Sequence, residues 1–130
     1  MRMAEVASTI SHAQRLKVGC VAVKDSRVLS IGVNGTPPGH DNACEDENNV
    51  TKQVVIHAEA NLIYKMARDG ERGLGADLFI THAPCFECAK AILTVGFGKV
   101  YYNNAYRDNS GVRFLEENGV EIEQYTPETA

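Results

Sequence analysis

The sequence predicts an α/β fold in which a mixed five-stranded sheet is covered by helices on both faces. Short runs rich in β-branched residues alternate with segments of helical periodicity along most of the chain. The first two of these runs are separated only by a short polar turn, which indicates a hairpin. An opening hairpin followed by alternating helices and strands is typical of mixed sheets with helical layers. The expected order is α-β-β-α-β-α-β-α-β.

The expected elements begin with a helix over residues 3–16, where apolar or small side chains recur with the helical period. Strands follow at 18–23 and 28–33, on either side of the polar turn 24–27. The segment 34–52 is expected to be a loop, and a loop of this length inside a compact domain is usually functional or mobile. The remaining expected elements are a helix at 54–68, a strand at 76–81, a helix at 85–95, a strand at 100–103, a helix at 111–117 and a strand at 120–125.

Length and charge narrow the class of protein. We expect a single domain over residues 1–130. The net charge of −4 favours a small substrate over a nucleic acid, because proteins that bind a phosphate backbone usually carry a basic face. The first 16 residues contain charged side chains and no signal-peptide core, and no apolar run reaches the ~20 residues that cross a membrane. We therefore expect a cytoplasmic protein with reduced cysteines and no membrane partner.

Two cysteines three positions apart follow a proline at the start of an expected helix. On a first helical turn, Cys85 and Cys88 project from the same side, and the helix N-terminus stabilises their thiolates. Pro84 suits that position. Such a pair serves in redox chemistry, in a structural zinc site or in a catalytic one; the redox use is disfavoured because it occurs near the first strand and helix of its folds. A closed structural site needs a fourth ligand, and Cys20 is expected in the core and Cys44 as a free loop thiol.

His57 and Glu59 favour the catalytic interpretation. Together with Cys85 and Cys88, His57 gives three protein ligands and leaves the fourth position of a tetrahedral zinc open, as catalytic zinc sites do. Glu59 lies two residues further on, where a carboxylate can reach the same pocket and act as general acid and base. His-x-Glu followed by Pro-Cys-x-x-Cys is the signature of zinc-dependent nucleobase deaminases.

With these motifs the sequence resembles the deoxycytidylate (dCMP) deaminase family, from residue 18 to about residue 125. The resemblance implies a three-layer α/β/α fold and usually a homohexamer. It also implies a Zn²⁺-dependent hydrolysis of dCMP to dUMP and ammonia, which supplies dUMP for thymidylate synthesis. Further matching segments lie at 18–23, 32–39, 57–63, 84–92 and 106–108.

The resemblance also implies where the nucleotide binds. It places Asn34 against the sugar and base and Tyr106 at the substrate pocket. Arg15, just before the first strand, is a candidate contact for the 5′-phosphate. The alternatives are an exposed helix-end charge for Arg15 and a surface aromatic for Tyr106.

The sequence departs from the family in two places. Val33 stands where many members carry a tyrosine that contributes to the effector site. The resemblance implies activation by dCTP with Mg²⁺ and inhibition by dTTP, but this sequence lacks that tyrosine of the effector site. Some relatives hold a second, structural zinc in a long insertion. The loop 34–52 offers only His40 and Cys44 for such a site, which predicts one zinc per chain.

Two alternatives remain at this point. One is a deaminase of another nucleobase substrate, such as tRNA adenosine, guanine or cytosine, and the other is a non-catalytic zinc domain. A structural zinc site would not need Glu59, and a tRNA enzyme would be expected to place basic residues around its pocket. In this sequence the C-terminal part is acidic rather than basic, with Glu116, Glu117, Glu121, Glu123 and Glu128. We expect the acidic run 45–47 to be a solvated loop face.

Overall fold

The computed structural model describes residues 1–125, so Glu128 lies outside the described part of the chain. No helix within this part is long and apolar enough to cross a bilayer. In chain order the elements are α1 (Arg2–Ser8), β1 (Gly19–Lys24), β2 (Arg27–Val33), α2 (Ala58–Asp69), β3 (Asp77–His82), α3 (Phe86–Val95), β4 (Lys99–Asn104), α4 (Ser110–Glu117) and β5 (Glu121–Gln124).

The five strands form one mixed sheet in the order β2-β1-β3-β4-β5. Strand β1 runs antiparallel to β2 and to β3, whereas β3, β4 and β5 are parallel to one another. The β1–β2 hairpin closes through Asp25 and Ser26, whose φ angles of 51° and 64° fit the two-residue turns that match strand twist. The predicted hairpin and mixed sheet are therefore confirmed.

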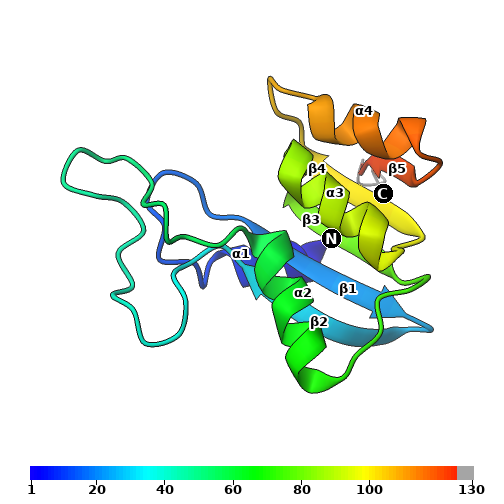
Figure 1. Ribbon diagram of the computed structural model, residues 1–130, viewed down its shortest axis with the longest axis horizontal. Coiled ribbons are helices and arrows are strands. Elements are labelled where there is room, and N and C mark those ends of the chain that lie inside the picture. Colours follow the sequence, from blue (N-terminus) through cyan, green and yellow to red (C-terminus); the bar gives the residue numbers. More distant parts are fainter. Residues whose placement is uncertain (126–130) are drawn as a thin grey trace.

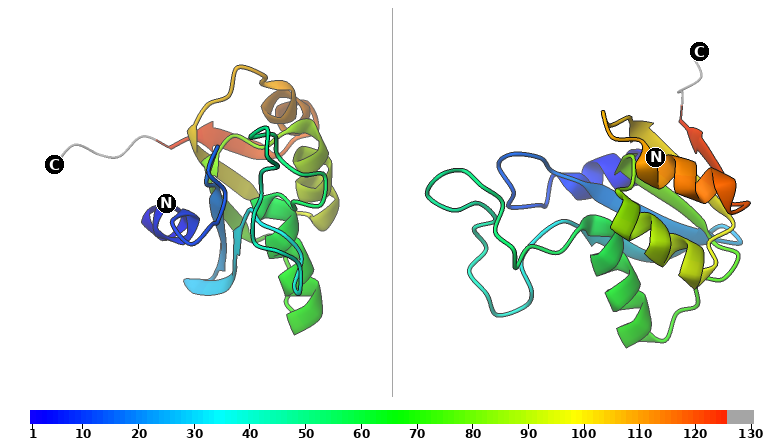
Figure 2. Two further views of the ribbon diagram at one scale, coloured as in Figure 1. Left: turned by 90° about the vertical axis from the view of Figure 1, so that its left-hand side faces the viewer. Right: turned by 45° about the horizontal axis from the view of Figure 1, so that its top comes forward.

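The helices lie on both faces of the sheet, which confirms the predicted three layers. Helix α1 covers one face, and α2, α3 and α4 lie on the other (Figures 1 and 2). The connection from β2 to α2 projects beyond the sheet at the end where α2 begins (Figure 1). This arrangement brings the starts of α2 and α3 to the same end of the sheet as the last residue of β3.

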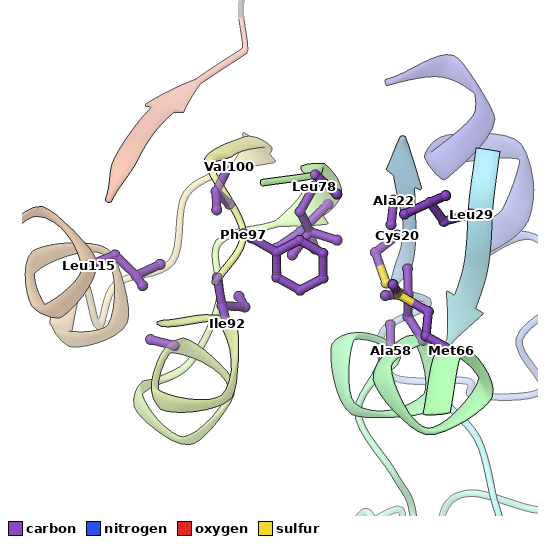
Figure 3. Close-up of a cluster of buried hydrophobic side chains, with 14 residues drawn as sticks. Cys20, Ala22, Leu29, Ala58, Met66, Leu78, Ile92, Phe97, Val100 and Leu115 are labelled. Atoms are coloured by element: carbon purple, nitrogen blue, oxygen red, sulfur yellow. The ribbon is translucent and has the colours of Figure 1, made fainter. Parts of the chain in front are cut away.

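The core lies between the sheet and the layer formed by α2, α3 and α4 (Figure 3). Its largest fully buried side chains come from both layers, which removes their apolar surface from water. Cys20 belongs to this core, as its apolar strand predicts. The bulkiest members are Leu62, Leu78, Ile80, Ile92, Val100 and Leu115.

A glycine in β2 sets the approach of α2 to the sheet. A Cβ atom at Gly32 would lie 2.3 Å from the carbonyl oxygen of Ala58 and 2.7 Å from the Cβ of Leu62. Only glycine leaves room for this contact. The first turn of α2 is therefore fixed directly against β2.

Two predicted helices begin or end elsewhere. The first ends at Ser8 instead of residue 16. The hydroxyls of Ser8 and Thr9 donate hydrogen bonds of 2.6 Å to the carbonyls of Glu5 and Val6, and so compete with the backbone N–H groups that would continue the helix. The second begins at Ala58 instead of residue 54. Residues 53 and 54 form a turn instead, and Ile56 and His57, directly before the helix, are extended.

The extended segment before α2 is held by the loop that follows β2. The N–H of Gly35 donates to the carbonyl of Ile56 at 3.1 Å, and the N–H of Ile56 donates back to Gly35 at 2.8 Å. This isolated bridge closes the base of the loop. It also sets the direction in which the chain enters α2.

Candidate active site

The predicted metal ligands lie at the starts of two helices on the same face of the sheet. His57 is the N-cap residue of α2 and Cys85 is the N-cap residue of α3. Neither side chain makes a capping hydrogen bond to its own helix. The imidazole and the thiol are therefore free to bind another group. Helix N-termini beside strand ends are where ligands bind in sheets of this kind.

The three predicted ligands meet within a few ångströms. The Nδ1 atom of His57 lies 3.5 Å from the Sγ of Cys85 and 3.4 Å from the Sγ of Cys88. The ligand atoms of all three residues lie within 4.8 Å of one another. Zinc–nitrogen and zinc–sulfur bonds at a tetrahedral angle would separate N from S by roughly 3.6 Å. The side chains fit a tetrahedral zinc with one position left for a further ligand.

The charges of this trio also favour a cation. Hydrogen bonds from Cys88 and from His57 lower the pKa of the Cys85 thiol well below its usual range. The neighbouring Cys85 sulfur and burial raise the pKa of Cys88, so a second thiolate forms only against that repulsion. A divalent cation would remove the repulsion, because both thiolates could then bind it.

Glu59 lies in the first turn of α2 and is only 5% exposed. It lines the same cavity as His57 and Cys85. Burial raises the pKa of its carboxyl to about 7. A buried carboxyl that both gains and loses its proton near neutral pH is suited to general acid and base chemistry.

The cavity beside this group has a volume of about 450 Å³, within the range of small-molecule sites. All three residues that the sequence assigned to the substrate, namely Arg15, Asn34 and Tyr106, line it. Arg15 is exposed and Asn34 is half-buried. Of the predicted site residues, Cys88 alone does not line this cavity, and it contacts His57, which does.

Asn34 has a structural task that the sequence did not reveal. Its Oδ1 accepts a 2.9 Å hydrogen bond from the N–H of Val18, and its Nδ2 donates to the carbonyl of Leu16 at 2.8 Å. An amide has two acceptor positions and two hydrogens. One acceptor position and one hydrogen hold the chain next to Arg15, and the second acceptor position and the second hydrogen remain for a ligand.

Glu45 is a cavity residue that the sequence analysis missed. Its carboxylate accepts hydrogen bonds from the backbone N–H of Gln14, at 3.1 Å to each oxygen, and from that of Arg15 at 3.2 Å. The expectation of a solvated loop face is therefore wrong for Glu45, although Asp46 and Glu47 are exposed. Its 31-residue separation from Gln14 left no local signal in the sequence.

His82 is the second missed residue of the cavity wall. It is the last residue of β3 and is half-buried. Its ring stacks on Tyr106, with centroids 5.8 Å apart and an angle of 23° between the planes. A polar residue at the carboxyl end of a strand, just before the Pro-Cys pair, was the available signal.

Comparison with known proteins agrees with this geometry. The family model described as the cytidine and deoxycytidylate deaminase zinc-binding region matches residues 1–104. The chain is 31% identical to the deoxycytidylate deaminase of Saccharomyces cerevisiae over 136 residues, which cover 97% of the chain but only 43% of the yeast protein. It is 33% identical to that of Mycobacterium phage D29 over 114 residues, covering 77% of the chain and 88% of the relative.

A solved structure is also closely similar. The dCMP deaminase of cyanophage S-TIM5, in complex with dCMP and dUMP, superimposes with a TM-score of 0.92 and is 45% identical in sequence. The match covers 95% of this chain and 92% of the cyanophage chain. His57, Glu59, Cys85 and Cys88 all lie within the residues that the family model matches. The chain belongs to the zinc-binding family of cytidine and deoxycytidylate deaminases.

Proposed function

We propose that this protein is a zinc-dependent deaminase that hydrolyses dCMP to dUMP and ammonia. The observation that carries the proposal is the placement of Glu59 beside a three-ligand metal trio, in a cavity that also exposes Arg15. The similarity to a cyanophage enzyme whose structure contains dCMP and dUMP supports the choice of nucleotide.

The residues at the metal end divide the chemistry between them. His57, Cys85 and Cys88 would hold the zinc. When bound, zinc supplies a Lewis acid that lowers the pKa of a coordinated water toward roughly 7. Glu59, buried at the start of α2, would accept a proton from the water whose oxygen bonds to C4 of the cytosine ring, and would deliver that proton to N3. The same carboxyl would carry a second proton to the amino nitrogen that leaves as ammonia.

The residues at the other end would hold the nucleotide. Within residues 1–125, no carboxylate lies within ion-pair distance of the Arg15 guanidinium. That charge is available to a 5′-phosphate, which a protein of net charge −4 would otherwise repel. We assign to Asn34 a contact with the sugar and base through its remaining hydrogen and lone pair, and to Tyr106 a place beside the base.

The proposal extends to assembly and regulation. We propose a cytoplasmic homohexamer that supplies dUMP for thymidylate synthesis. Three apolar side chains on and just after α1, Met3, Val6 and Ile10, are 50%, 67% and 66% exposed, which favours burial against another surface. Activation by dCTP with Mg²⁺ and inhibition by dTTP rest on the resemblance around residues 34–39, and Val33 lacks the phenol of the family tyrosine.

A substrate panel tests the activity. The zinc-loaded protein is given dCMP, CMP, deoxycytidine and guanine, and the change in ring absorbance is followed. Two charge-assisted bonds to a phosphate, at about 1.5–3 kcal/mol each, predict a preference for dCMP over deoxycytidine of roughly 10²–10⁴-fold in kcat/KM. Preferred turnover of guanine would instead support the free-base alternative.

The Arg15→Ala variant tests the phosphate contact. It should lower kcat/KM for dCMP and leave the residual deoxycytidine activity almost unchanged. Arg113→Ala is the matched control, because Arg113 is exposed on α4 and lies outside the cavity. Equal turnover of deoxycytidine and dCMP by the wild type would show that the phosphate contributes nothing.

A further inference from the structure

His82 is held in the cavity wall by the residue that precedes it. Its Nδ1 atom lies 2.8 Å from the hydroxyl oxygen of Thr81. The same hydroxyl oxygen accepts a 3.1 Å hydrogen bond from the backbone N–H of Gly19, at the start of β1. The imidazole is therefore linked through one hydroxyl to the neighbouring strand.

This pair of contacts determines which ring nitrogen carries the proton. Thr81 is buried, and within residues 1–125 its hydroxyl has no hydrogen-bond partner besides Gly19 and His82. If Nδ1 carried the proton, the hydroxyl would accept two hydrogen bonds and its own hydrogen would be buried without an acceptor, which is strongly unfavourable. The hydroxyl therefore donates to Nδ1, and in the neutral ring the proton is on Nε2.

The surroundings keep the ring neutral and fixed. Burial lowers the pKa of His82, which favours the uncharged imidazole at neutral pH. The Nδ2 of Asn104 donates to the carbonyl of Thr81 at 2.9 Å, and the N–H of Ala83 donates to the carbonyl of Asn104 at 2.8 Å. These two bonds hold the backbone on either side of His82, and Tyr106 stacks on the ring itself.

The Nε2 atom is accessible to solvent. It has no hydrogen-bond partner in the described part of the chain. Every buried side-chain nitrogen or oxygen in this part does have a partner, so Nε2 is not buried. His82 itself lines the cavity. A neutral N–H donor that is accessible to solvent thus belongs to a residue of the cavity wall.

We propose that His82 is a specificity-determining residue that donates a hydrogen bond from Nε2 to an acceptor oxygen of the bound nucleotide. The proposal rests on the function proposed above, because it needs a nucleotide in the cavity. Two kinds of oxygen have the required chemistry, those of the 5′-phosphate and those of the base and sugar. Because the donor is neutral, it forms no ion pair with either kind of oxygen. Its main contribution is therefore to orient the bound nucleotide.

Nuclear magnetic resonance tests the tautomer without any turnover. In ¹⁵N-labelled, zinc-loaded protein, long-range ¹H–¹⁵N spectra distinguish a protonated Nε2 from a protonated Nδ1. The chain has four histidines, and His82→Phe identifies the signals of His82 by their loss. We expect a protonated Nε2 and an unprotonated Nδ1. The reverse tautomer in the wild-type protein would overturn the proposal.

Kinetics of two variants test the contact with the nucleotide. His82→Phe keeps a flat ring against Tyr106 but has no donor, whereas His82→Gln places an amide N–H at a similar reach. We expect His82→Phe to lower kcat/KM for dCMP by roughly 10–100-fold and His82→Gln to restore most of it. His12→Phe is the matched control, because His12 is exposed and lies outside the cavity.

The choice of substrate then separates the two sources of the oxygen. A loss with dCMP but not with deoxycytidine assigns the phosphate, and an equal loss with both assigns the base or sugar. A folded His82→Phe variant as active as the wild type on both substrates would overturn the proposal. A wild-type protein that does not deaminate dCMP would overturn the proposed function itself. The tautomer measurement needs no turnover, so its outcome is independent of that result.

Discussion

Replacing Gly32 by alanine should damage the active site by displacing the first turn of α2. The added Cβ would lie 2.3 Å from the carbonyl oxygen of Ala58, 2.7 Å from the Cβ of Leu62 and 2.8 Å from the backbone nitrogen of Leu62. Non-bonded carbon atoms normally lie about 3.5–4.0 Å apart. Two of the three neighbours are backbone atoms of α2, so the helix itself must withdraw by about 1 Å.

The size of the effect follows from that displacement. Adding a methyl group to a packed contact costs about 1–3 kcal/mol. For a domain of this size each kcal/mol corresponds to a Tm change of roughly 3–6 °C. Helix α2 also carries His57 and Glu59, and a misplacement of about 1 Å in a catalytic group can lower the rate by ~10²-fold.

Thermal unfolding and dCMP turnover of the zinc-loaded protein measure both effects. Gly35→Ala is the matched control, since a Cβ at Gly35 would meet nothing within 4 Å. We expect Gly32→Ala to lose stability, zinc affinity and turnover together, and Gly35→Ala to resemble the wild type. If the two variants behave alike, the close approach at Gly32 does not position the site.

The other predictions concern individual side chains of the site. Glu59→Gln should retain the fold and the zinc but lower turnover by ~10²–10⁴-fold, and a variant that keeps more than a tenth of the wild-type rate would remove Glu59 from proton transfer. Metal analysis should find about one zinc per chain, lost in Cys85→Ser, and two tightly bound zinc ions would contradict the prediction for the loop 34–52. Glu45→Ala should raise the KM for dCMP and speed hydrogen exchange at the amides of Gln14 and Arg15, with Glu45→Gln less affected; unchanged exchange would exclude this positioning role.

The metal site was predictable because its signals are local. Cys85 and Cys88 are separated by less than one helical turn, and His57 and Glu59 by two residues, so the geometry within each pair follows from the helix start alone. Only the meeting of the two pairs depends on tertiary structure. The order of strands and helices supplies it, because both helices begin at the same end of the sheet.

The missed residues depend on contacts between distant parts of the chain. Glu45 binds the backbone of Gln14, and no periodicity or spacing reports a contact across 31 residues. The late start of α2 has a similar cause. In place of the expected first helical turn the chain makes a turn at residues 53 and 54 and then the bridge between Gly35 and Ile56, a tertiary contact that overrides the local helical pattern.

The tautomer of His82 was also out of reach of the sequence. It depends on a hydroxyl in the preceding residue and on a backbone N–H in a different strand. Thr81 next to His82 is visible in the sequence, but nothing local shows that Gly19 already occupies one lone pair of its hydroxyl.

The two uncapped helix starts have a consequence for the life of the protein before it acquires metal. Residues such as serine or aspartate at an N-cap commonly stabilise a helix by about 1 kcal/mol, and neither His57 nor Cys85 does so here. Before metal binds, the beginnings of α2 and α3 therefore lack this side-chain contribution to their stability. A metal bound by both would join them, so that binding energy becomes folding energy. We therefore expect zinc supply during synthesis to determine the amount of protein that survives proteolysis. This effect is separate from the effect of zinc on the turnover rate of each molecule.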